Sequence, residues 1–93
     1  MIELKENEVR LWTVATGYVD PFKKASRDEV DFIKKLHGFI GVHPVPGRGT
    51  LWLFDTENNA KIARNKMEGK GIVCGRSICD CGVDKKYLEG NLQ

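Results

Sequence analysis

The sequence predicts one α+β domain whose elements follow the order strand, helix, strand, strand, helix, strand. Short runs rich in β-branched, aromatic and other apolar residues are bounded by glycine or proline, which is typical of strands. Two longer segments repeat apolar residues at helical spacing next to capping residues. A length of 93 residues fits a single domain. We expect its folded core to cover about residues 9–84 and a tail to cover 85–93.

The first half of the chain contains two expected strands and the helix between them. Residues 9–16 are rich in β-branched and aromatic side chains, which predicts a strand. Ser26 and Glu29 have the spacing of a capping box, so we expect a helix over about residues 27–37. Gly38 is a natural left-handed end for that helix. A short second strand is then expected over residues 39–42.

The second half of the chain contains the remaining elements. Two prolines and two glycines make residues 43–49 an expected loop, because they weaken a strand ladder. The apolar run 50–54 predicts a buried third strand, and the helix after it is expected to be capped by Asp55 or Thr56. Gly69 is its expected end. Residues 72–81 are expected to form a minor hairpin that leads into the fourth strand.

The composition is that of a folded domain rather than a disordered or membrane-spanning chain. Hydrophobic residues make up 41% and charged residues 30% of the chain, which is ordinary for globular proteins. No run approaches the roughly 18 apolar residues that cross a bilayer, and the charged N-terminus lacks the apolar stretch of a signal peptide. Three cysteines without an export signal fit free thiols in a reducing compartment. We therefore expect a cytoplasmic protein with no membrane partner.

Part of the chain resembles the RNA-recognition motif family. The third-strand octapeptide of that family is similar at its end to residues 51–54, Leu-Trp-Leu-Phe. The family's spacing of small and apolar residues after that strand is matched by Ala60, Ala63, Met67 and Gly69. Residues 11–14, Leu-Trp-Thr-Val, look like the family's first-strand hexapeptide. The resemblance implies a ferredoxin-like fold with a four-stranded antiparallel sheet of order 4-1-3-2 and both helices on one face.

The aromatic positions of this family are mostly missing here. The residues at the two third-strand positions that stack on bases in the family are Gly49 and Leu51. By the same spacing Trp52 is expected to face the helices, although a shift of one residue would exchange the two faces of the strand. Trp12 alone matches a base-stacking position.

The sheet face without helices is the expected binding surface, because a contiguous exposed apolar patch usually marks a site of interaction. The residues expected to line it are Arg10, Trp12, Val14, Leu51, Leu53, Ile78 and Asp80.

Two kinds of partner fit this surface, and single-stranded RNA is expected first, with a protein partner as the alternative, because the spacing matches the RNA-recognition motif family. The resemblance implies single-stranded RNA, with Trp12 stacking on a base. The expected phosphate contacts and the continuation of the RNA path are Arg10, Arg48, Arg76, Lys85, Lys86 and Tyr87. The small net charge of +2 and the two leucines in place of aromatic residues favour a protein partner instead. That partner would be a protein that the domain regulates or inhibits, or a second copy bound through the sheet.

Catalysis and cofactor binding are not expected. Asp28 and Glu29 are explained by helix capping, which leaves no carboxylate pair for acid–base chemistry. The Gly47-Arg48-Gly49 turn precedes a strand rather than a helix, so it is not a phosphate-binding loop. We therefore expect a binding module that is not an enzyme and carries no cofactor.

The cysteine spacing predicts that the purified protein contains no metal. Cys74, Cys79 and Cys81 follow the pattern C-x4-C-x-C, which does not supply the four ligands of a structural zinc site. Elemental analysis of protein purified without chelator is the measurement, and one equivalent of zinc would contradict the prediction.

Overall fold

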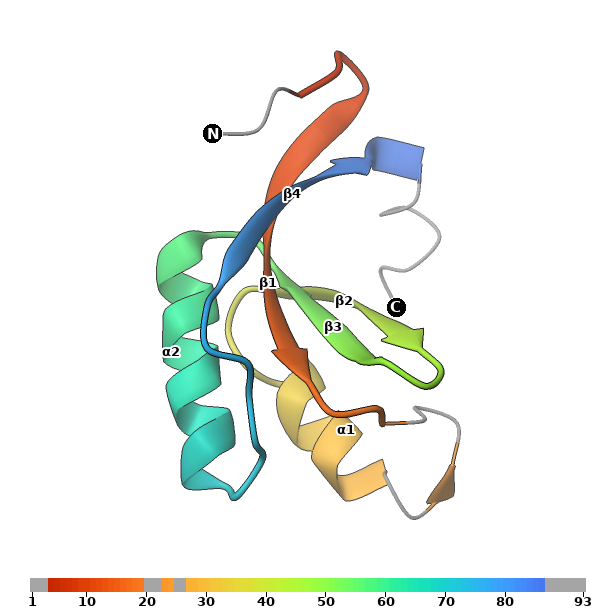
Figure 1. Cartoon of the computed structure of the whole chain (residues 1–93). Coiled ribbons are helices and arrows are strands. Elements are labelled where there is room, and N and C mark those ends of the chain that lie inside the picture. The colour runs from red at the N-terminus through yellow and green to blue at the C-terminus, as the bar shows by residue number, and fades with distance from the viewer. Residues whose placement is uncertain (1–3, 20–22, 25–26, 87–93) are drawn as a thin grey trace.

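The structure, a computed structural model, describes residues 4–19, 23–24 and 27–86. The elements follow the predicted order (Figure 1). Their bounds are β1 Glu8–Thr16, α1 Arg27–Lys34, β2 Phe39–Val45, β3 Gly49–Phe54, α2 Glu57–Gly69 and β4 Cys79–Asp84. The predicted α+β class is confirmed. Ser26 of the predicted capping box and the tail from residue 87 lie outside the described residues.

The four strands form one antiparallel sheet in the order β2-β3-β1-β4. This is the reverse of the predicted 4-1-3-2, so every strand has the neighbours that were expected. β3 and β1 are the central strands, while β2 and β4 form the two edges.

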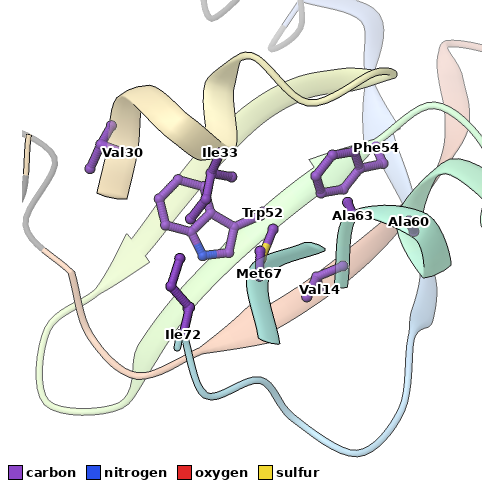
Figure 2. Close-up of a cluster of buried hydrophobic side chains, with 9 residues drawn as sticks. All are labelled: Val14, Val30, Ile33, Trp52, Phe54, Ala60, Ala63, Met67 and Ile72. Atoms are coloured by element: carbon purple, nitrogen blue, oxygen red, sulfur yellow. The ribbon is translucent and has the colours of Figure 1, made fainter. Parts of the chain in front are cut away.

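Both helices pack against the same face of the sheet and enclose the buried core (Figure 2). β1 and β3 are paired so that Val14 lies opposite Trp52 and Trp12 lies opposite Phe54. These side chains point toward the helices, because alternate residues of a strand share one face. The small side chains of Ala60 and Ala63 let α2 approach the sheet closely. The core consists of Val14, Val30, Ile33, Trp52, Phe54, Ala60, Ala63, Met67 and Ile72.

Trp52 is the largest fully buried side chain of the protein's described part, with an exposed fraction of 0%. Figure 2 shows its ring between side chains of α1 and α2. The indole N–H donates a hydrogen bond to Thr16 Oγ1 at 2.9 Å, so its one polar atom is satisfied inside the core. The prediction that Trp52 faces the helices is therefore confirmed.

Local signals account for the helix ends. Thr56 caps α2, and its hydroxyl accepts a hydrogen bond from the Asn59 backbone N–H at 3.1 Å. α1 ends at Lys34, three residues before the predicted end at residue 37. Its last turn tightens through a hydrogen bond from the Leu36 N–H to the Ile33 carbonyl. Gly38 then adopts a φ of +84°, and a Cβ there would collide with neighbouring side chains.

The predicted loop over residues 43–49 is wrong in its first part. β2 continues to Val45, and Pro44 lies opposite Thr50 of β3. Proline is tolerated there because β2 is an edge strand, where a backbone without an N–H donor is acceptable. The turn between the strands closes with a hydrogen bond of 3.0 Å from the Arg48 N–H to the Val45 carbonyl.

The predicted hairpin over residues 72–81 is also wrong. Cys74 forms an isolated bridge with Thr16, and the Gly75 N–H donates to the Ala15 carbonyl at 2.7 Å. The segment therefore lies along the end of β1 instead of folding back on itself. β4 begins at Cys79 and pairs with β1. Neither helix in the described residues is long and apolar enough to cross a membrane.

Replacing Trp52 should test the role of this core. Trp52→Ala removes a fully buried ring, so we expect the free energy of unfolding to fall by about 3–5 kcal/mol. Val73→Ala is the control, because Val73 is 83% exposed and its loss should change stability by less than about 0.5 kcal/mol. Urea denaturation measures both, and a Trp52→Ala protein as stable as wild type would contradict the packing.

Candidate functional site

The sheet face opposite the helices is the candidate binding surface, and it is termed the open face. Its residues are those that alternate with the core positions of each strand. They are Val9, Leu11, Thr13, Ala15, Gly41, His43, Val45, Gly49, Leu51, Leu53, Cys79, Cys81 and Val83. None of these strand positions is Asp, Glu, Lys or Arg, although 30% of the chain is charged. None is Phe, Tyr or Trp, so this part of the chain offers apolar contact without an aromatic platform.

A shallow hollow of about 320 Å³ lies on this face. It is lined by Thr13, His43, Leu51, Leu53, Cys79, Asp80, Cys81 and Val83. The lining comes from all four strands, so the hollow extends across the sheet. Leu53 is only 4% exposed and lies on a central strand, whereas His43 and Cys79 are exposed on the two edge strands. The centre of the face is therefore apolar, and its polar groups lie toward the edges.

Leu51 and Leu53 lie on the open face as predicted. Across β1, Leu51 is opposite Ala15 and Leu53 is opposite Thr13. Across β2, Leu51 is opposite His43. The predicted positions of these two β3 leucines on the open face are therefore confirmed.

The predicted placement of Trp12 and Val14 on this face is wrong. Val14 is 1% exposed within the core, and Trp12 packs against that core from its position opposite Phe54. The physical reason is the pairing of β1 with β3, which places Thr13 and Ala15 beside the leucines. Because the side-chain period of a strand is two, an error of one residue in the pairing exchanges the two faces.

Ile78, Arg10 and Asp80 are likewise not open-face side chains. Ile78 packs against the helix-side core. Asp80 lies opposite Trp12 and so shares its side of the sheet, although it also borders the hollow. Its carboxylate oxygen Oδ2 is 3.6 Å from Arg10 Nε.

The residues of β4 that do reach the open face are Cys79, Cys81 and Val83, which the sequence reasoning missed as site residues. The alternation in Cys-Asp-Cys was the available signal, since two cysteines flanking a charged residue on one strand must share a face. Thr13 and His43 were also missed.

The predicted basic residues separate into two groups. Arg48 is exposed in the turn between β2 and β3, at one end of the strands. Lys85 and Lys86 are exposed immediately after β4, at the other end. The Arg76 carbonyl instead accepts a hydrogen bond from Arg64 Nη1 of α2 at 3.1 Å, which places this loop beside the helix. Tyr87 lies outside the described residues.

Two of the three cysteines, Cys74 and Cys81, have a raised pKa. Burial raises the pKa of Cys81, and the nearby Asp80 and Cys79 raise it further. Burial also raises the pKa of Cys74, which lies on the helix side with its Sγ 3.9 Å from Met67 Sδ. Glu68 adds to that increase and Arg64 opposes it. Neutral thiols are weak nucleophiles and behave as small apolar groups.

Metal coordination finds little support in this geometry. Among the described residues, no three His, Cys, Asp or Glu side chains lie close enough to share an ion. The absence of metal from the purified protein remains a prediction.

The fold and the open face define a class of protein: an α+β domain with a buried helix-side core and an uncharged apolar sheet face. No protein-family model, no curated protein and no solved structure matches the chain. The function must therefore be argued from the open face itself.

Cysteine labelling should distinguish the exposed Cys79 from the two partly buried thiols. At neutral pH we expect iodoacetamide to modify exposed Cys79 first, and Cys81 and Cys74 more slowly. The raised pKa values leave less thiolate at these two sites, and thiolate is the reactive form. Labelling in urea is the control, because all three should then react alike. Mass spectrometry gives the rates, and faster labelling of Cys81 than of Cys79 in the folded protein would contradict this arrangement.

Proposed function

We propose that this chain is a protein-binding module with a ferredoxin-like βαββαβ fold, and that the open face is its docking surface. The order of the elements, the strand order and the helices on one face support the fold. The observation that carries the function is the composition of the open face, which combines Leu51 and Leu53 with the absence of charged side chains and aromatic rings from its strand positions. A surface of this kind is stabilised by covering it with another apolar surface.

The chemistry of the face supports binding rather than catalysis. The raised pKa of Cys81 makes it a poor nucleophile at neutral pH. His43 and Cys79 lie on opposite edge strands, so the sheet separates the base from the exposed thiol. All three cysteines are free, which supports a reducing compartment such as the cytoplasm.

Single-stranded RNA is the second candidate partner. The family-like spacing around β3 favours it, and so do the exposed cations Arg48, Lys85 and Lys86 at the two ends of the sheet. Both tryptophans lie on the helix side, Trp52 fully buried and Trp12 partly buried, and this weighs against RNA, because sequence-tolerant RNA binding relies on aromatic rings that stack on bases.

A charge placed on the open face should separate the two functions. We expect Leu51→Asp to weaken capture of a protein partner by about 100-fold or more, because it would bury an unpaired carboxylate in an apolar interface. Ile62→Asp is the matched control, since Ile62 is 43% exposed on α2 and lies away from the open face. Affinity capture from cell extract, quantified by mass spectrometry, compares both variants with wild type. Circular dichroism verifies that each variant is folded.

The same proteins are titrated with pools of short single-stranded RNA and sized in solution. No RNA binding at low salt supports the proposal, as does a dimer of the chain that Leu51→Asp dissociates. RNA binding by a monomer would contradict it. A log–log salt slope near about −2, for roughly three phosphates at −0.7 each, would identify such binding as nucleic-acid recognition.

A further inference from the structure

The size of the open face limits what can cover it. β3 and β4 each contain six residues but pair with opposite ends of the nine-residue β1, so the face is about 30 Å long at the usual rise per residue. Four strands at the usual spacing place the two edge strands about 14 Å apart. The strands contain 28 residues at about 16 Å² each, so the projected area is about 450 Å², which is well below the roughly 800 Å² per partner of a typical stable interface. A second copy packed sheet to sheet would be a weak dimer.

A single helix matches these dimensions better. An α-helix with its side chains is about 10–12 Å across, and about 20 residues span 30 Å. One apolar stripe of such a helix would cover Leu51 and part of the hollow beside it.

The exposed charges at the two ends of the face indicate which charges the ends of that helix should carry. Arg48 is exposed at one end of the strands, and Lys85 and Lys86 are exposed at the other. The carboxylates near the lysines are turned to the helix side, because Glu8 and Asp84 lie opposite one another and alternate with Val9 and Val83.

These carboxylates also have local hydrogen-bond partners. Glu8 Oε1 accepts from the Lys5 N–H at 3.0 Å. Asp84 accepts from Asn7 Nδ2 and from the Lys86 N–H, both at 2.8 Å. The open face therefore presents an apolar centre with positive charge at both ends. Glu8 and Asp84 are directed to the helix side, and Asp80 at the border of the hollow lies beside Arg10.

We propose that the open face binds an amphipathic helix of a partner protein that carries an apolar stripe and acidic residues near both of its ends. This inference rests on the proposed function and adds the chemistry of the partner. The apolar stripe supplies the contact area, and the acidic ends face Arg48 on one side and Lys85 and Lys86 on the other.

Synthetic peptides test this with the full chain. Three fluorescent helical peptides of about 22 residues are compared. The first has a leucine stripe and glutamates near both ends, the second has lysines in place of those glutamates, and the third has the composition of the first in an order that breaks the stripe. By fluorescence anisotropy at about 50 mM salt, we expect the first to bind at least about tenfold more tightly than the second, and the third not to bind. Salt at about 500 mM should reduce the difference.

Charge reversal provides a matched pair of variants. Arg48→Glu, Lys85→Glu and Lys86→Glu combined should reverse the preference, so that the lysine peptide binds more tightly. Lys34→Glu, Lys61→Glu and Lys66→Glu combined change the net charge equally on exposed positions of α1 and α2, and should leave the preference for acidic ends in place.

Other results would overturn the inference in ways that identify the alternative. Equal binding of the glutamate and lysine peptides would agree with the proposed protein-binding function but would contradict the inference that the partner carries acidic ends. Binding of none of the peptides, with a dimer that Leu51→Asp dissociates, would identify a second copy as the occupant. Tighter peptide binding after Tyr87→Ser and Leu88→Ser in the full chain would identify the chain's own residues 87–93 as the occupant. Single-stranded RNA that binds a monomer and displaces the peptide would overturn both the inference and the proposed function.

Discussion

The burial of Trp52 decides which side of the sheet is left for a partner. Its ring is enclosed by both helices, and its N–H is bonded to Thr16, so rotating β3 to expose it would cost both the packing and a satisfied polar group. Because alternate strand residues point in opposite directions, this one orientation places Leu51 and Leu53 on the open face. The same alternation carries across the sheet and keeps Trp12 on the core side.

On the resulting surface, the apolar centre supplies affinity, and the charges at the ends of the strands supply specificity. Its centre offers apolar side chains, which favour contact with any apolar surface of matching shape. Its limited area means that such contact alone gives little binding energy. Charges at the ends of the strands can then discriminate between partners, because like charges placed together there would be unfavourable. An elongated partner fits this division better than a broad flat one.

The candidate site was predicted in part. The position of Leu51 and Leu53 followed from the spacing between Phe54 and the small residues of α2, since a strand and the helix that follows it are close in the chain. Trp12 and Val14 were placed on the wrong face because the alignment of β1 with β3 joins residues about 40 positions apart, as between Val14 and Trp52. The open-face role of Cys79 and Cys81 depended on the pairing of β4 with β1, which is more distant still.

By itself the sequence determined the order of the elements, the start of α2 after a cap at Asp55 or Thr56, and the left-handed glycine after α1, because these depend on neighbouring residues and on backbone sterics. Only the tertiary structure decided that β2 extends through Pro44, since a proline is acceptable there only in an edge strand. It alone also decided which side chains of β1 and β4 face outward. Strand pairing is set by the packing of the whole sheet on its helices, and a shift of one residue, which alters little in the local sequence pattern, exchanges core and surface.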